Sequence, residues 1–293
     1  MLETLATGGL SVDALHPLLL DPILTAALRE DLGSGDLTSQ LVLEESDRAV
    51  GNVTFREPGV VAGVGVLARV FYLADPAITT QVLVSEGALA EAGAVVARVS
   101  GPARGMLMAE RVALNLLQRM CAVATTSHRF VERLAGSKTR LLDTRKTTPG
   151  LRVLERYAVR TGGGRNHRFG LSDAVMIKDN HIVLAGSIAE AVRRARRGIP
   201  VTAKIVVEAD TLFQVQEALA AGADHILLDN MTNEEIEQAV ALVAGRIPVE
   251  ASGGITLERA SAIARTGADY LSTSAITRLA GFLDISLDMV SAG

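Results

Sequence analysis

The sequence contains no tryptophan, only 3% aromatic residues and a single cysteine among 293 residues. One cysteine, Cys121, cannot form an intrachain disulfide, which fits a reducing compartment and makes the cytoplasm the expected location. General nucleic-acid binding usually requires a broad basic surface with exposed aromatic side chains. A formal net charge of −4 and the scarcity of aromatics therefore argue against a nucleic-acid partner.

Long hydrophobic runs are missing as well. The apolar runs at residues 18–20 and 60–67 are far shorter than the roughly 20 residues that a membrane-spanning helix needs. Residues 1–9 do not resemble a signal peptide, because Glu3 stands where basic residues are expected and no sufficient apolar stretch follows. We expect no membrane association. Apolar residues still make up 48% of the chain, enough for a large core in one large domain or two ordinary ones.

The first third of the chain has the pattern of a small α+β domain. Alternating or continuous apolar stretches, with turns rich in glycine and proline between them, predict strands at residues 49–56, 59–62, 78–85 and 95–100. A helix is expected over 65–73, and another after Asp21, which would cap it with Pro22 in the first helical position. Residues 104–134 predict a long helix with too many apolar positions for one stripe, so it should be buried between layers.

From residue 136 onward, strands and helices alternate. Strands are expected at 140–143, 174–178, 203–208, 224–229, 248–251 and 270–273, and helices at 151–160, 188–197, 211–221, 233–243 and 257–266. This alternation indicates right-handed βαβ units and a parallel sheet. Six such units predict an α/β barrel with fewer strands than the eight-stranded type.

Residues 140–181 form a basic segment in a mildly acidic chain, with nine Lys or Arg against four Asp or Glu. We therefore expect an anion to bind here. Polar or small residues also follow each predicted strand: Arg145-Lys146, Lys178-Asp-Asn-His181, Glu208, Asp229-Asn230, Ser252-Gly253-Gly254 and Thr273-Ser274-Ala275. Because the carboxyl ends of barrel strands meet at one rim, these groups are expected to form a single site.

The basic residues of this segment could bind a ligand or could simply face the solvent. Arg145, Lys146, Arg168 and Lys178 favour ligand binding, whereas Arg152, Arg156 and Arg160 are typical of a solvated helix face. His167 could bind an anion or an aromatic nitrogen, but it and His181 could equally be satisfied polar residues.

The remaining strand ends have alternatives too. The glycine pair and the 273–275 turn offer backbone N–H groups to a phosphate, although each alone could be an ordinary tight turn. Glu208 and Asp229 could hold Mg²⁺ with pyrophosphate oxygens, or form salt bridges to Lys146 or Lys178, and both could hold at once. This composition suits the transfer of a phosphorylated sugar to an acidic acceptor.

Three motifs occur in a specific order and spacing: DTRKT from Asp143, GGGRNHR from Gly162, and IKDNH from Ile177. With ERVALNLL, ILLDN, EASGGI and LDISLDM, they make nearly the whole chain similar to the quinolinate phosphoribosyltransferase (nicotinate-nucleotide pyrophosphorylase, carboxylating) family. The resemblance implies an N-terminal α/β sandwich, expected here at 1–115 with the tail 280–293, and an open, incomplete α/β barrel at 116–279. It also implies Mg²⁺ and a homodimer or an assembly of dimers.

The implied reaction joins quinolinate and phosphoribosyl pyrophosphate to give nicotinate mononucleotide, pyrophosphate and CO₂ for NAD biosynthesis. The resemblance assigns the quinolinate carboxylates to Arg145, His167, Arg168 and Lys178, and Arg111 to the neighbouring subunit's site, in place of a local ion pair with Glu110. The ribose and pyrophosphate would contact Thr144, Lys146, Glu208, Asp229 and Asn230, with Lys146, Glu208 and Asp229 as the catalytic residues and the two carboxylates as metal ligands. The 5′-phosphate would contact Ser252, Gly253, Gly254, Thr273, Ser274 and Ala275.

Two departures from the family pattern affect these expectations. Lys204 stands where many members carry a second carboxylate, and Ser274 stands where glycine is usual. Two other functions are also open: a nicotinate phosphoribosyltransferase, and a non-catalytic relative found with molybdate transport genes. The retained DTRK and NHR residues argue against the non-catalytic relative, and a monocarboxylate would not need two clusters of carboxylate binders.

Overall fold

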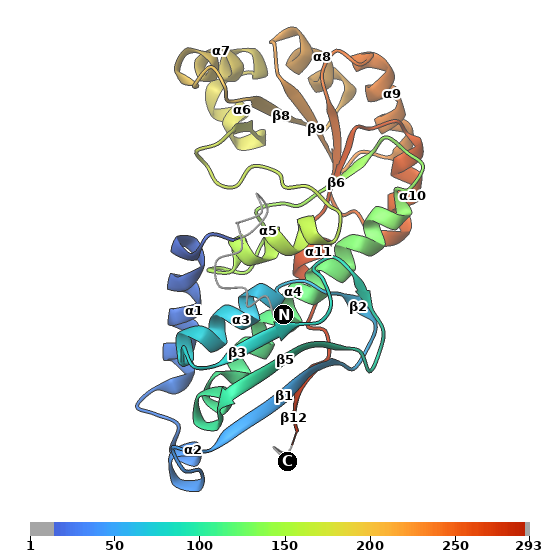
Figure 1. Ribbon diagram of the computed structural model, residues 1–293. Helices are drawn as coiled ribbons and strands as arrows, with labels where there is room; N and C mark the ends of the chain where they lie inside the picture. Colours follow the sequence, from blue (N-terminus) through green and yellow to red (C-terminus); the bar gives the residue numbers. More distant parts are fainter. Residues whose placement is uncertain (1–14, 291–293) are drawn as a thin grey trace. The chain divides into compact units, whose positions relative to one another are not determined.

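The computed structural model describes residues 15–290, so the segment 1–9 discussed above lies outside the described residues. The chain forms two compact units, Met1–Met120 with Leu283–Gly293, and Cys121–Phe282 (Figure 1). The long helix α4 (Ala103–Arg133) contains both this boundary and the one expected after residue 115. Among the described residues, no helix is long and apolar enough to cross a bilayer.

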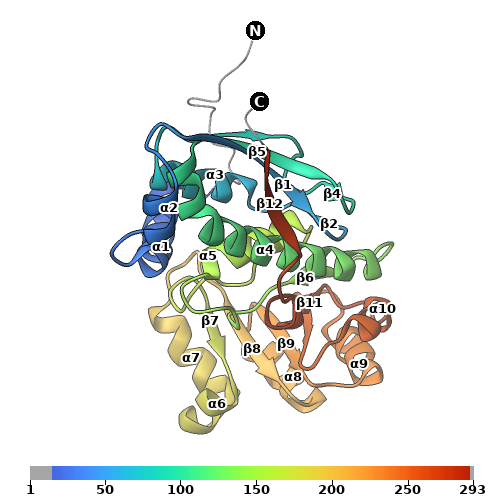
Figure 2. The same cartoon turned by 90° about the horizontal axis from the view of Figure 1, so that it is seen from below.

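Unit 1 is built on an antiparallel sheet in the order β12-β1-β5-β3. The strands are β1 (Arg48–Phe55), β3 (Thr79–Val82), β5 (Val95–Pro102) and β12 (Ile285–Val290), with a separate ribbon of β2 (Gly59–Val60) and β4 (Leu89–Ala90). The C-terminal β12 pairs with β1 from Val50–Val290 to Phe55–Ile285 (Figure 2). Helices α1 (Pro17–Leu32) and α3 (Val64–Ala74) pack on each other, and α2 (Leu37–Val42) was not expected.

The predicted start of the first helix was wrong. Helix α1 begins at Pro17, where His16 caps it by accepting a hydrogen bond from the Leu18 N–H at 3.1 Å, and Pro22 lies inside the helix. Asp21 instead accepts two hydrogen bonds from Arg69, at 2.8 and 2.7 Å. Those bonds lower the pKa of the Asp21 carboxyl, so this residue links α1 to α3 and is not a cap.

Unit 2 contains a six-stranded parallel sheet in the order β6-β11-β10-β9-β8-β7. Its strands are β6 (Arg140–Leu142), β7 (Val175–Ile177), β8 (Ile205–Ala209), β9 (His225–Asp229), β10 (Val249–Ser252) and β11 (Tyr270–Ser272). The last strand, β11, returns to pair with β6, whereas β6 and β7 both stand at an edge. The predicted open barrel is thus confirmed, with its opening between β6 and β7.

Helices connect these strands, and α7 to α10 pack against the sheet (Figure 1). They are α5 (Arg152–Thr161), α6 (Asp179–Ala185), α7 (Ile188–Gly198), α8 (Leu212–Ala220), α9 (Asn233–Val243), α10 (Leu257–Arg265) and α11 (Ala275–Arg278). Only α6 and α11 were not expected. His181 belongs to the α6 cap, because its Nδ1 accepts the Lys178 N–H at 3.1 Å.

Candidate functional site

A cavity of about 380 Å³ lies at the carboxyl ends of the unit 2 strands. We call it the basic cavity, because four Lys or Arg and one His are among its lining residues. These residues are Asp143, Thr144, Arg145, Lys146, His167, Arg168, Met176, Lys178, Glu208, Leu227, Asp229, Glu250, Ser252 and Ser272. Segments from both sides of the barrel opening contribute, since Arg145 follows β6 and Lys178 follows β7.

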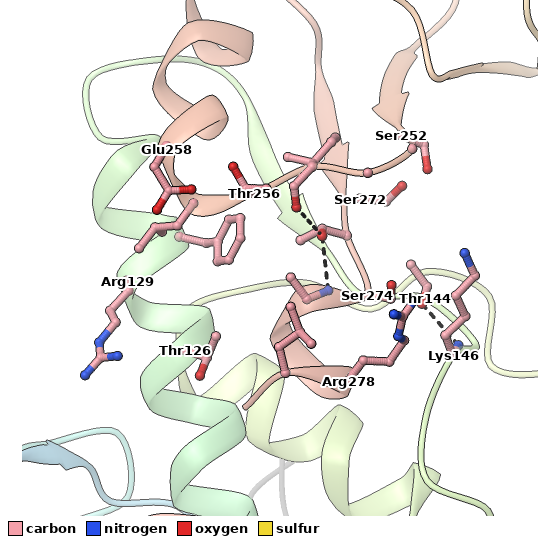
Figure 3. A pocket seen from close by; sticks show the side chains of 18 of the residues that line it. Thr126, Arg129, Thr144, Lys146, Ser252, Thr256, Glu258, Ser272, Ser274 and Arg278 are labelled. Carbon is pink, nitrogen blue, oxygen red and sulfur yellow. Dashed lines mark hydrogen bonds between the residues drawn. The ribbon is translucent and has the colours of Figure 1, made fainter. Parts of the chain in front are cut away.

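A second cavity of about 540 Å³ adjoins the first. We call it the glycine cavity, because Gly253 and Gly254 lie in its wall with the 273–275 turn. Figure 3 shows Arg278 lying toward Lys146, with Arg129 on the far side of the cavity (Figure 3). The two cavities share the lining residues Thr144, Lys146, Asp229, Ser252 and Ser272.

The turn at the glycine pair requires glycine at its first position. Gly253 has φ of +90°, and a Cβ there would lie 2.3 Å from the Asn230 Oδ1 and 2.6 Å from the Asn230 nitrogen. Gly254 also has positive φ, +57°, but a Cβ would meet nothing within 4 Å. Asn230 thus lies behind this turn, and it lines a different depression with residues 231–234 and Arg259.

The carboxylates predicted to bind metal have protein partners. Glu208 forms a close ion pair with Lys178, as the alternative interpretation held. Asp229 accepts a hydrogen bond from the Asn230 side chain at 2.8 Å. Both carboxylates line the basic cavity, and Asp229 also lines the glycine cavity.

The prediction that Arg156 lies on a solvated helix face was wrong. Its side chain and that of Asp143 are both 0% exposed, and they are joined by hydrogen bonds of 2.9 and 2.8 Å. Arg156 also donates to the carbonyl oxygens of His167 and, at 2.6 Å, of Arg168. Burial raises the pKa of the Asp143 carboxyl, while the Arg156 charge and the surrounding donors favour its ionised form.

The neighbouring arginines of α5 also contact the loops around the site. Arg152 donates to Thr147 Oγ1 at 3.0 Å, and Arg160 donates to Asn166 Oδ1 at 2.7 Å. The helix therefore holds the loops that follow β6 and precede β7, and its basic face is covered by them.

His167 lies at the edge of the basic cavity with both of its nitrogens close to protein atoms. Its Nδ1 accepts the Arg168 N–H at 2.7 Å, and its Nε2 lies 3.3 Å from the Glu250 Oε2. Arg168 donates to the Ala174 carbonyl, in the same segment before β7, at 3.0 Å. Burial, and then the nearby Arg145 charge, lower the pKa of the Arg168 guanidinium, which nevertheless stays protonated at neutral pH.

Arg111 belongs to unit 1, and its side chain is 60% exposed. Its Nη2 lies 3.7 Å from the Glu110 Oε1, which makes a loose local ion pair within the chain. Ser274 and Lys204 are the two residues that depart from the family pattern. Ser274 lines the glycine cavity, whereas Lys204 lies just before β8 and its carbonyl oxygen accepts the Val175 N–H.

Sequence reasoning missed three buried polar residues of this region, Asp143, Arg156 and Glu250, and the half-buried His225. A partial signal existed for Asp143, which stands directly after the β6 strand within the DTRK motif. The others gave none, because a charged residue inside a helix or strand pattern is usually taken as solvent-facing.

Comparisons with known proteins show which family the chain is similar to. Residues 36–121 match the N-terminal domain of quinolinate phosphoribosyl transferase, and residues 123–288 match its C-terminal domain. The chain belongs to the quinolinate phosphoribosyltransferase family.

Individual members of the family are similar over almost the whole chain. A probable carboxylating nicotinate-nucleotide pyrophosphorylase of Synechocystis is 44% identical over 99% of both chains. The nicotinate-nucleotide pyrophosphorylase (carboxylating) of Mycobacterium leprae is 42% identical over 90% of this chain and 94% of its own. The crystal structure of NadC from Streptococcus pyogenes superposes with a TM-score of 0.91 at 42% identity, covering 94% of this chain and 98% of that one.

Proposed function

We propose that the chain transfers the phosphoribosyl group of phosphoribosyl pyrophosphate to quinolinate with decarboxylation, giving nicotinate mononucleotide, pyrophosphate and CO₂ for NAD biosynthesis. The observation that carries this assignment is the pair of adjoining cavities with Lys146 and Asp229 at their junction. One cavity suits a planar dianion and the other suits a phosphorylated sugar, so the reacting atoms of the two substrates would meet at the shared wall.

The basic cavity suits quinolinate because it presents several fixed positive charges to a small volume. Arg145 and Arg168 can each donate paired N–H groups to a planar carboxylate, and Lys178 adds a point charge. Holding the dianion in this way aligns the ring nitrogen with the sugar and lowers the entropic cost of the reaction. Glu208, paired with Lys178, limits the charge that would remain in the empty cavity.

The glycine cavity suits the 5′-phosphate of the sugar. Backbone N–H groups around Gly253, Gly254 and Ser274 would bind its oxygens, with Thr273 and Ala275 in the same turn. Because Gly253 has no Cβ to press on Asn230, the turn can keep the conformation that places these N–H groups in the cavity wall. Arg278 adds a positive charge to the lining of the same cavity.

The chemistry follows from the residues at the junction. When the bond between C1 of the ribose and pyrophosphate breaks, the positive charge that develops at the sugar would be stabilised by Asp229 and Glu208, and Lys146 would stabilise the leaving group. The quinolinate nitrogen then forms the new bond to C1. The cationic pyridinium favours loss of the adjacent carboxylate as CO₂, and a proton replaces it on the ring carbon.

Mg²⁺ fits this junction. No group of three or more metal-ligating His, Cys, Asp or Glu occurs among residues 15–290, but Mg²⁺ needs only one or two carboxylates with water and substrate phosphates. Glu208 and Asp229, at the ends of the adjacent strands β8 and β9, would hold it. When bound, the ion supplies charge neutralisation of the pyrophosphate.

A second copy of the chain is proposed to complete each site. Arg111 is exposed and only loosely paired with Glu110, so it is available to a neighbouring subunit of a dimer, or of an assembly of dimers. There it would add a further positive charge to the quinolinate pocket.

Turnover of defined substrates tests the function. Purified protein with quinolinate, phosphoribosyl pyrophosphate and Mg²⁺ is expected to release CO₂ and form nicotinate mononucleotide, and chelation of Mg²⁺ should stop it. A parallel reaction with nicotinate and ATP tests the monocarboxylate alternative. Turnover of nicotinate alone would replace the proposal with that alternative, and turnover of neither acid would favour a binding role.

A further inference from the structure

Glu250 is a buried charged residue that the proposed chemistry does not use. It lies on β10 two residues before Ser252, is 0% exposed, and forms part of the lining of the basic cavity. Its Oε2 lies 2.9 Å from the His225 Nε2 and 3.3 Å from the His167 Nε2. Among the described residues, neither carboxylate oxygen has a hydrogen-bond partner, so these contacts are ion-pair contacts. Burying a carboxylate costs free energy unless it is paired, so we ask what this carboxylate does beneath the cavity.

The charge state of Glu250 favours contact with the two rings. Burial raises the pKa of its carboxyl, but the two imidazoles outweigh burial and lower the pKa to about 2. The carboxylate is therefore ionised at neutral pH and acts only as an acceptor. An ionised acceptor favours a proton on each ring nitrogen that faces it.

The position of the His167 proton follows from its other nitrogen. Nδ1 accepts the Arg168 N–H at 2.7 Å, so Nδ1 carries no proton and the ring is the neutral tautomer with the proton on Nε2. Nε2 is the nitrogen that faces Glu250.

The backbone around this ring is fixed at every polar group. The His167 N–H donates to the Asp143 Oδ1 at 2.8 Å, and Arg156 donates to the carbonyl oxygens of His167 and Arg168. The Arg168 N–H is held by the His167 ring itself. Of these contacts to the Arg168 backbone, only the one from the His167 ring involves a group that Glu250 touches.

We propose that Glu250 is a positioning residue of the quinolinate pocket: its carboxylate holds the His167 ring, and the ring holds the Arg168 backbone that presents the guanidinium to the substrate. His225 holds the same oxygen from the other side, where its ring stacks on Tyr270 with centroids 5.7 Å apart and planes at 13°. This inference rests on the proposed function, because it assigns Arg168 to quinolinate.

Steady-state kinetics with three variants test the role. Glu250→Ala is expected to raise the KM for quinolinate roughly tenfold to 100-fold, through misplacement of Arg168, and to change the KM for phosphoribosyl pyrophosphate little. Glu250→Gln should restore most of the affinity, since one amide oxygen can accept from both rings. Val249→Ala is the control, because Val249 is buried on the same strand but faces away from the cavity. A Glu250→Ala variant that folds and keeps the wild-type KM, or an equal rise in Val249→Ala, refutes the proposal.

A double-mutant cycle tests the route of the effect. If Glu250 acts through the ring, Glu250→Ala should add nothing to the loss of quinolinate binding already caused by His167→Ala, as measured by calorimetry. Additive losses would mean that the carboxylate acts by another route, and the proposal would fail.

The ¹⁵N NMR signals of the histidine rings report on the ring contact directly. They need neither substrate nor a folded Glu250→Ala variant. The chain has only five histidines, so selective labelling is practical. The His167 signals should show a protonated Nε2 and an unprotonated Nδ1, and Glu250→Gln should shift the signals of His167 and His225 while Val249→Ala leaves them in place. Unshifted signals in Glu250→Gln would overturn the contact. A wild type that binds no quinolinate would instead refute the proposed function, with the ring contact still measurable.

Discussion

Asp143 and Arg156 bring two opposite charges into the interior of unit 2, where neither side chain is exposed. Removing one member leaves the other unpaired in a low-dielectric environment, which costs about 3–5 kcal/mol. We expect Arg156→Ala to lower the free energy of unfolding by about that amount and to loosen the backbone at 167–168. Urea unfolding measures it.

Arg152→Ala is the matched control for this prediction. Arg152 lies one turn earlier on α5 and also donates to a loop, but its side chain is only half-buried, and among residues 15–290 no carboxylate forms an ion pair with it. Its loss should cost about 1 kcal/mol. Equal losses in the two variants would show that burial of the pair is not the cause.

The depressed pKa of Glu250 predicts a specific acid sensitivity. Its carboxyl titrates near 4.5 in the unfolded chain and at about 2 in the folded protein, so the folded state binds fewer protons between these values. The resulting stability, about 3 kcal/mol, is fully present above pH 4.5 and is lost as the pH falls toward 2. Glu250→Gln lacks this titration. The stability difference between wild type and Glu250→Gln should therefore shrink as the pH falls below 4.5, and a constant difference would contradict the assignment.

At the scale of elements, the turn after β10 depends on a missing Cβ. In Gly253→Ala the new methyl group would meet Asn230 at 2.3 Å in a backbone of positive φ, so the turn must move. The KM for phosphoribosyl pyrophosphate is expected to rise roughly tenfold or more. Gly254→Ala has the same kind of backbone strain, about 1–2 kcal/mol, but open space around the methyl group, so its effect should be smaller. The reverse order would contradict a steric origin.

The sequence was sufficient for the strand–helix alternation of unit 2 and for the residues at the strand ends, but not for the buried residues beneath them. Alternating strands and helices predicted the parallel sheet, and the rule for strand ends brought Arg145, Lys178 and Asp229 to one pair of cavities. Helical periodicity placed Arg156 on a polar face correctly, yet it could not show that the 166–168 loop covers that face. The buried position of Glu250 could not be predicted for a related reason. Its partners His167 and His225 come from other segments of the chain.

For the whole molecule, the exposed Arg111 predicts that activity depends on a pair of chains. Arg111→Ala and Arg145→Ala should each be nearly inactive alone, the second through lost quinolinate binding while the fold persists. In a mixed dimer, the site of the Arg111→Ala subunit keeps its own Arg145 and would receive Arg111 from the Arg145→Ala subunit. That site would be intact, whereas the other site would lack both arginines. Random exchange of subunits should therefore restore about a quarter of the wild-type activity. A mixture no more active than its parents would show that Arg111 does not serve the neighbouring site.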